Sequence, residues 1–213
     1  MDDINEKGAV ATPESDFYKE SLVLFEGAIS EILTRIDIIR RYFVATGRRD
    51  PVEYCKARVK TPQSTKNKLV SRGLEPTYEN ALEHLNDVAG TRVVCTFVDD
   101  VYSVVDMIKK QDDLVILNEK DYIRDPKPNG YRSYHMIVRV PIHLPEGMTY
   151  VTAEIQLRTL AMDCWAALEH RIKYKRDVPH KEMIRDELKR CADEIASTDL
   201  TLKTLRDVID KME

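Results

Sequence analysis

The sequence predicts an α/β protein with a long helix near each end of the chain. Two observations support this class. Apolar residues recur at alternating spacings of three and four near both termini, and short runs of β-branched or alternating residues occupy the middle. With 213 residues, 43% of them hydrophobic, the chain is long enough for one globular domain with helical additions, or at most two small domains.

The N-terminal region is expected to be a flexible tail followed by a helix. Residues 1–14 are polar and acidic, with no apolar run of the kind that marks a signal peptide. A heptad-spaced apolar stripe follows, and Gly47 is expected to end the helix that carries it. The stripe consists of Leu22, Phe25, Ile29, Ile32, Ile36, Ile39 and Phe43.

The middle of the chain predicts alternating strands and helices. Strands are expected at 91–98, 114–117, 135–142 and 150–158, and helices at 101–110 and 160–174. In the last strand the apolar residues alternate with polar ones, so each set lies on its own face. The apolar set is Val151, Ala153, Ile155 and Leu157, and the polar set is Thr152, Glu154, Gln156 and Arg158.

A second heptad-spaced stripe predicts a helix at the C-terminal end, which we expect to form an extension from residue 179 to 213. One interpretation is that each terminal helix covers the core of its own domain. The other is that one or both helices build an oligomer interface. The stripe consists of Ile184, Leu188, Cys191, Ile195, Leu202, Leu205, Ile209 and Met212, with Thr198 as a polar interruption.

Charge and cysteine content exclude several classes of protein. The chain has 33 Lys and Arg against 37 Asp and Glu, a net charge of −4, which argues against a general nucleic-acid binder. Its four cysteines form no C-x-x-C motif, so zinc and dithiol sites lack support, and free cysteines fit the cytoplasm. No run of about 18 apolar residues occurs, so we expect no membrane span.

A basic segment from residue 56 to 72 contains no acidic residue. Such a segment is suited to hold a polyanion such as a triphosphate, with Ser64 and Thr65 as hydroxyl donors. The alternative is a solvated basic helix face. The chain has no glycine-rich phosphate loop, so phosphate binding here would depend on side chains. The cations are Lys56, Arg58, Lys60, Lys66, Lys68 and Arg72.

Two acidic residues lie where strands are expected to begin or to face a cleft. Asp87 precedes Gly90 and a buried strand, a position from which a carboxylate can hold Mg²⁺, although it can also simply cap a turn. Glu154 lies on the polar face of the last strand, which is either an exposed face or the lining of a cleft. If the two carboxylates converge, they form a two-carboxylate Mg²⁺ site with open positions for phosphate oxygens.

The segment from Lys120 to His135 is rich in both cations and tyrosines. Its two prolines and the Asn129-Gly130 pair predict a loop. Tyrosine beside Arg and Lys is suited to stack on a base and to hold its phosphates, whereas composition alone also fits a charged surface turn.

Over residues 20–178 the chain resembles the synthetase domain of the RelA/SpoT family, most closely its small alarmone synthetases. The similar motifs span 87–92, 126–135, 154–159 and the helix from Ala161 to His170. The resemblance implies a synthetase domain at 15–178 built on a nucleotidyltransferase-like mixed sheet flanked by helices. It also implies transfer of pyrophosphate from ATP to the 3′-hydroxyl of GDP or GTP, with release of AMP, in stringent-response signalling.

The resemblance also implies roles for individual residues. Asp87 and Glu154 would be catalytic and hold Mg²⁺, with Glu154 also a candidate base for the 3′-hydroxyl, and Tyr131 would stack on guanine. ATP would be held by Arg58, Lys60, Ser64, Lys68 and Arg92. The guanine nucleotide would also meet Lys120, Lys127, Asn129, His135, Gln156 and Arg158.

The family further implies a cytoplasmic homotetramer whose chemistry requires neither a membrane nor a nucleic acid. Asn118 stands where many long members carry Arg, which leaves the preference between GDP and GTP open. Two other functions stay open from the residues themselves. One is a nucleotidyltransferase that attacks the α-phosphate, and the other is a non-catalytic nucleotide- or RNA-binding module.

Overall fold

The computed structural model describes residues 12–174 and 181–212, and these contain a mixed five-stranded sheet. The strand order is β1-β2-β5-β4-β3. Only β2 and β5 are parallel, and the other neighbours are antiparallel. The predicted α/β class with a mixed sheet is therefore confirmed. The strands are β1 (Val52–Val59), β2 (Ala89–Cys95), β3 (Val115–Asp121), β4 (Tyr134–Leu144) and β5 (Gly147–Thr159).

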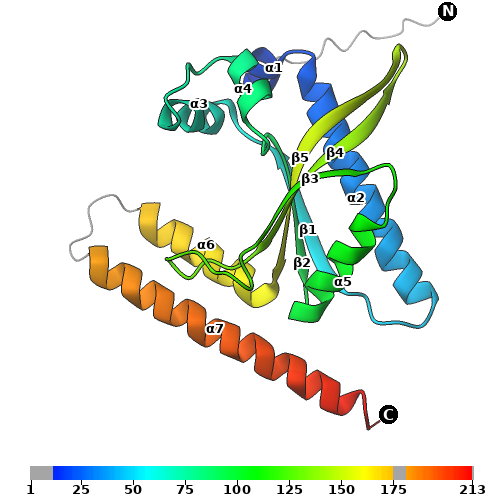
Figure 1. Ribbon diagram of the computed structural model, residues 1–213, viewed down its shortest axis with the longest axis vertical. Helices are drawn as coiled ribbons and strands as arrows, with labels where there is room; N and C mark the ends of the chain where they lie inside the picture. Colours follow the sequence, from blue (N-terminus) through cyan, green and yellow to red (C-terminus); the bar gives the residue numbers. More distant parts are fainter. Residues whose placement is uncertain (1–11, 175–180, 213) are drawn as a thin grey trace, which may run out of the picture.

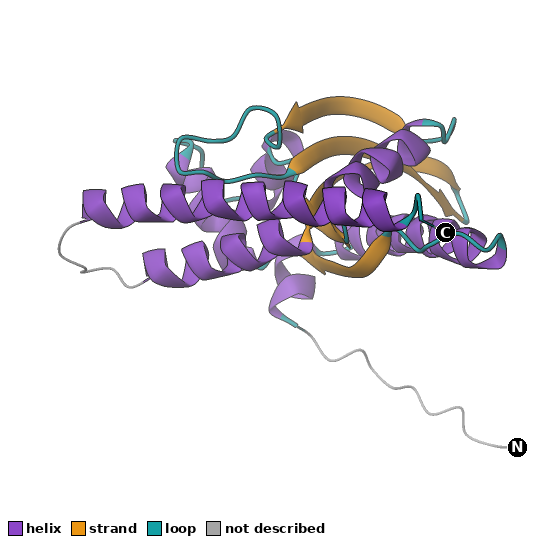
Figure 2. Cartoon of the chain, turned by 90° about the horizontal axis from the view of Figure 1, so that it is seen from below, coloured by secondary structure: helices purple, strands orange, loops and turns teal. Residues whose placement is uncertain are grey.

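Helices cover both sides of the sheet, as Figure 1 shows. Helices α2 and α5 lie on one side, α6 and α7 lie on the other, and α1, α3 and α4 gather near one end of the strands. Helix α7 runs alongside α6 (Figure 2). The helices are α1 (Pro13–Tyr18), α2 (Ser21–Ala45), α3 (Pro62–Ser71), α4 (Tyr78–His84), α5 (Val98–Lys109), α6 (Leu160–Tyr174) and α7 (Lys181–Ile209).

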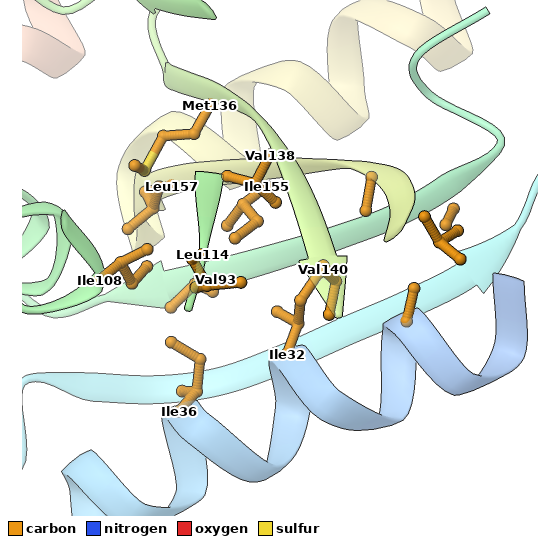
Figure 3. Close-up of a cluster of buried hydrophobic side chains, with 14 of the residues drawn as sticks. Ile32, Ile36, Val93, Ile108, Leu114, Met136, Val138, Val140, Ile155 and Leu157 are labelled. Atoms are coloured by element: carbon orange, nitrogen blue, oxygen red, sulfur yellow. The ribbon is translucent and has the colours of Figure 1, made fainter. Parts of the chain in front are cut away.

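The apolar stripe of α2 faces the sheet of its own chain. Phe25, Ile32 and Ile36 are buried, and Figure 3 shows the two isoleucines directed at strand residues such as Val93 and Val140. The helix stops at Ala45, and Gly47 then adopts a φ of +70°, as expected for a helix-ending glycine. For the N-terminal stripe, the structure therefore favours the intradomain interpretation over an oligomer interface.

Most predicted elements occur with shifted ends, and α6 has the predicted bounds. The strand predicted to reach residue 98 ends at Cys95, because the Asp100 carboxylate accepts a hydrogen bond from the Phe97 N–H at 3.1 Å and starts α5 early. Helix α1 begins at Pro13 behind a Thr12 cap, so the last two residues of the expected tail are helical. Residues 1–11 lie outside the described part.

The C-terminal stripe is only half covered. Ile184, Leu188 and Ile195 are partly buried, whereas Cys191 and the later members of the stripe are exposed: Leu202 by 49%, Leu205 by 55%, Ile209 by 56% and Met212 by 82%. The side of α7 that packs against the rest of the domain is partly polar. There Thr159 donates to the buried carboxylate of Asp199 at 2.5 Å. No helix in the described part of the chain has both the length and the apolar content needed to cross a bilayer.

Candidate active site

A cleft of about 650 Å³ lies between the polar face of the sheet and helix α6. Its floor comes from β1, β2 and β5, and α6 supplies one wall. The residues on the sheet side are Lys56, Ala57, Arg58, Lys60, Asp87, Gly90, Thr91, Arg92, Tyr131, Glu154, Gln156 and Arg158. Those on α6 are Ala166, Ala167, Glu169, His170 and Arg171.

Strand register gathers the polar residues of the floor. One row across the sheet runs through Lys56, Arg92, Gln156, His135 and Lys120, each paired with the next on a neighbouring strand. Residues directly opposite each other lie on the same face of a sheet, so this row brings together residues far apart in sequence. Lys120 ends the row on the edge strand β3, where it is exposed and outside the cleft lining.

The basic segment divides into two elements that meet at Asp87. Lys60 follows β1 and Lys68 lies on α3, and both ammonium groups donate to Asp87 Oδ2, at 2.7 and 2.6 Å. Tyr18 of α1 holds this junction, because its hydroxyl donates to the Lys60 carbonyl at 2.7 Å and contacts the hydroxyl of buried Thr65 at 2.5 Å. Two of the six cations therefore converge on a carboxylate, whereas the other four, Lys56, Arg58, Lys66 and Arg72, are exposed.

Asp87 is ionised in this environment. Burial by itself would raise its pKa, but the hydrogen bonds and charges of Lys60 and Lys68 outweigh burial and hold the pKa below its ordinary value. The second carboxylate oxygen, Oδ1, is buried and accepts no hydrogen bond from the described residues. A buried anionic oxygen without a donor is suited to bind a cation.

Glu154 is also ionised. Burial would raise its pKa, and the charge of Asp87 would do the same, but His135 and Gln156 hold the pKa below the ordinary value. His135 Nδ1 lies 2.9 Å from Glu154 Oε1, and Gln156 Nε2 donates to Oε2 at 2.7 Å. The two carboxylates line one cleft, and the charge of Asp87 acts on Glu154.

These two residues fit a magnesium ion. Both are carboxylates, the ligand type that Mg²⁺ prefers, and Asp87 offers an oxygen with no other partner among the described residues. Within 12–174 and 181–212, no group of three or more His, Cys, Asp and Glu residues gathers into a protein-only metal site. Two carboxylates that share a cation with substrate phosphates are the usual arrangement for Mg²⁺ in phosphoryl-transfer sites.

A chain of hydrogen bonds connects Glu154 with the predicted base-binding tyrosine. The Tyr131 hydroxyl accepts from Arg158 Nη2 at 2.6 Å and lies 2.8 Å from His135 Nε2. For a neutral imidazole, the pattern that satisfies every group has Tyr131 donating to Nε2 and His135 donating from Nδ1 to Glu154. The loop and the strand carboxylate are thus one connected unit.

The loop that carries Tyr131 rests on helices α6 and α7. Asn129 donates to the Glu169 carboxylate at 3.0 Å. Arg132 donates to the Gly130 carbonyl, to the Ala192 carbonyl at 3.3 Å and to the carboxylate of Asp193 at 2.9 Å. Gly130 has a φ of +88°, and a Cβ there would lie 2.6 Å from that of Ala192, so only glycine fits between loop and helix.

The structure thus sorts the sequence-predicted site residues into three groups. Eight line the cleft: Arg58, Lys60, Asp87, Arg92, Tyr131, Glu154, Gln156 and Arg158. Four contact lining residues from behind or hold the loop: Lys68, Lys127, Asn129 and His135. Two lie apart from the lining: Lys120 on β3, and Ser64, which accepts a hydrogen bond from the Thr61 hydroxyl at the start of α3.

Sequence reasoning missed the α6 wall and one buried carboxylate. The lining residues of α6 are five of the six consecutive positions from 166 to 171, and they are of mixed type, so no periodic signal in the sequence marks them. Asp163, also on α6, is buried behind the cleft and pairs with Arg92 and Arg158. Its distance in sequence from Arg92 left no local pattern that could reveal this contact.

The fold and the cleft define a mixed-sheet α/β protein with a polar cleft lined by carboxylates and cations. Residues 57–178 match the model of a family described as the region found in RelA / SpoT proteins, and the chain belongs to that family.

Named relatives agree with this membership. The chain is 44% identical over 178 residues to the GTP pyrophosphokinase YwaC of Bacillus subtilis, with 83% of this chain and 84% of the relative covered. A structure of a GTP pyrophosphokinase family protein from Streptococcus pneumoniae superposes with a TM-score of 0.82 at 36% identity, covering 95% of this chain and 97% of the other. The structure of small alarmone synthetase 1 from Bacillus subtilis, bound to its product pppGpp, superposes with a TM-score of 0.82 at 30% identity, covering 91% of this chain and 98% of the other.

Proposed function

We propose that this protein is an ATP-dependent GTP/GDP 3′-pyrophosphokinase. It transfers the β,γ-pyrophosphate of ATP to the 3′-hydroxyl of GDP or GTP, makes ppGpp or pppGpp, and releases AMP. One observation carries the proposal: two ionised carboxylates, Asp87 and Glu154, face one cleft whose floor is lined with cations. The names of the relatives, GTP pyrophosphokinase and small alarmone synthetase, support the same activity.

The donor side of the cleft is formed by the cations around Asp87. Without nucleotide, Lys60 and Lys68 neutralise that carboxylate. When ATP binds, these ammonium groups pair with its phosphates, and Arg58 and Arg92 on the cleft floor add further donors. Asp87 and Glu154 would hold Mg²⁺, which when bound would neutralise the charge that develops on the transferred group.

The acceptor side is formed by the Tyr131 loop. Tyr131 offers an aromatic face to guanine, and its hydroxyl connects through His135 to Glu154. An ionised carboxylate connected to the Tyr131 loop supports entry of the 3′-hydroxyl from this side. The lowered pKa of Glu154 makes it a weak base and a good metal ligand, so positioning and charge neutralisation contribute more than proton abstraction.

The products of one turnover test the proposal. Attack of the 3′-oxygen on the β-phosphorus makes AMP the leaving group, whereas a kinase releases ADP and a nucleotidyltransferase releases pyrophosphate. The purified protein is incubated with Mg²⁺, ATP labelled on its γ-phosphate, and GDP or GTP in turn. The label is expected in the guanine nucleotide, with an equal amount of AMP. ADP or pyrophosphate as the stoichiometric co-product would refute the proposal.

The assembly and location of the enzyme are also inferred. The exposed apolar residues along the second half of α7, such as Leu205 and Ile209, support a homo-oligomer, and resemblance to the small family members favours a tetramer. The four cysteines are all free, which supports the cytoplasm, where its nucleotide substrates are found.

A further inference from the structure

A buried carboxylate behind the cleft joins two arginines that line it. Asp163 is 5% exposed and is not itself among the lining residues. Its Oδ1 pairs with Nη1 of Arg92 at 3.0 Å and with Nη1 of Arg158 at 3.1 Å. Its Oδ2 accepts a hydrogen bond from the hydroxyl of Tyr54 at 2.9 Å. Two guanidinium groups on neighbouring strands therefore share one oxygen atom.

The two arginines differ in how their remaining donors are used. Arg158 is 4% exposed and donates to the Tyr131 hydroxyl at 2.6 Å, to Gln156 at 3.0 Å and to Ser133 at 3.4 Å. Most of its five N–H groups are thus committed within the protein. The Arg92 side chain is 36% exposed, and its buried Nε has no hydrogen-bond partner among the described residues. Arg92 is therefore the member of the pair that can turn towards a phosphate.

We propose that Asp163 is a positioning residue that couples the donor and acceptor sides of the cleft. The inference rests on the proposed function, which assigns Arg92 to ATP and the Tyr131 loop to the guanine nucleotide. A guanine nucleotide that stacks on Tyr131 restricts the hydroxyl to which Arg158 donates. Arg158 then fixes Asp163, and Asp163 fixes Arg92. ATP that binds second meets an arginine already in place and loses less conformational entropy.

The coupling is measured as a ratio of affinities in the intact protein. The Kd of a non-hydrolysable ATP analogue is determined by calorimetry with Mg²⁺, first alone and then with saturating GDP. For the wild-type protein, GDP is expected to lower this Kd about fivefold or more, the range typical of coupled sites. Because coupling is reciprocal, the analogue should lower the Kd of GDP by the same factor.

Three variants locate the coupling. Asp163→Asn removes the charge shared by the arginines, and the ratio is expected to fall towards one. Arg92→Gln removes only the ion pair on the ATP side and is the second test if Asp163→Asn does not fold. In this variant too, GDP should no longer lower the Kd of the ATP analogue, whatever the affinity for the analogue alone. Tyr54→Phe removes the third contact of Asp163 but leaves both ion pairs, so it should retain the ratio.

The outcomes separate this inference from the proposed function. An active enzyme that binds both nucleotides with a ratio of one refutes the coupling alone. A ratio that survives in Asp163→Asn or Arg92→Gln also refutes it, as does a loss in Tyr54→Phe equal to that of Asp163→Asn. If the wild-type protein binds neither nucleotide, the proposed function itself is wrong.

Discussion

Replacing Glu154 by Gln tests the charge that the cleft places on β5. The change keeps the size and planar shape of the side chain and removes only its negative charge. Glu154 accepts two hydrogen bonds, one on each oxygen, from His135 and Gln156. A glutamine retains an oxygen for one of these donors and turns an amide group towards the other.

The structural cost is small and the catalytic cost is large. Loss of one partly buried hydrogen bond costs about 1 kcal/mol, which corresponds to about 2–4 °C in Tm for a protein of this size. Removal of a group that stabilises charge in the transition state lowers the rate by about 10²–10³, or roughly 2.7–4 kcal/mol. The variant should therefore remain folded but be nearly inactive.

The assay measures AMP release with saturating ATP, GDP and Mg²⁺, alongside a thermal melt. Glu119→Gln is the matched control, because Glu119 lies on β3 outside the cleft and accepts hydrogen bonds from Tyr134 and Lys109. It undergoes the same chemical change on the same sheet and should retain activity. If Glu154→Gln keeps more than about a tenth of the wild-type rate, its negative charge is not part of the catalytic machinery.

Three further outcomes follow from particular contacts. Tyr131→Ala should weaken binding of the guanine nucleotide by about 1–3 kcal/mol, with little change in the Kd of the ATP analogue measured without guanine nucleotide. Equal effects on these two affinities contradict the assignment, and exposed Tyr150→Ala is the control. Burial raises the pKa of Asp199, so the stability that its protonated form contributes is lost as pH rises above the ordinary value of 3.8. Asp199→Asn should therefore have a higher Tm than wild type near neutral pH, and this difference in Tm should shrink on acidification. A difference in Tm that does not depend on pH would refute this. Light scattering at micromolar concentration should show a wild-type oligomer that Leu205→Glu combined with Ile209→Glu dissociates, and a monomeric wild type contradicts the interface.

The sequence is most informative where one strand has two different faces. In β5 the alternation of polar and apolar residues identifies both the buried face and the cleft face, because the period of a strand is two and both faces of β5 are covered. The alternation alone therefore assigns Glu154 and Gln156 to one polar face, and the structure shows that this face lines the cleft. Asp87 is identified by its position next to a buried strand.

The basic segment shows what a charge pattern cannot resolve. The segment contains the end of a strand and a helix, and only Lys60 and Lys68 are brought together by folding. Thr61 caps α3 and Pro62 occupies its first turn, a helix-start signal that marks the break between the two elements. Lys120 shares a row with His135, but membership of a row does not show that a residue on the edge strand lies beyond the cleft.

For α7, apolar periodicity identifies the helix but not the face that packs. The packing face is held by polar contacts, such as Asp199 with Thr159 and Arg206 with Asp99, and it leaves the apolar stripe in solvent towards the C-terminal end. A hydrophobic pattern cannot reveal a surface that is fixed by hydrogen bonds and ion pairs.

The close packing of Gly130 against Ala192 means that helix α7 supports the conformation of the Tyr131 loop. A shortened chain that ends at residue 178 would keep every residue that lines the cleft. It would nevertheless lose both α7 partners of Arg132, the carbonyl of Ala192 and the carboxylate of Asp193, together with the surface that confines Gly130. Any ligand or subunit that displaces α7 would therefore loosen the Tyr131 loop without touching the cleft.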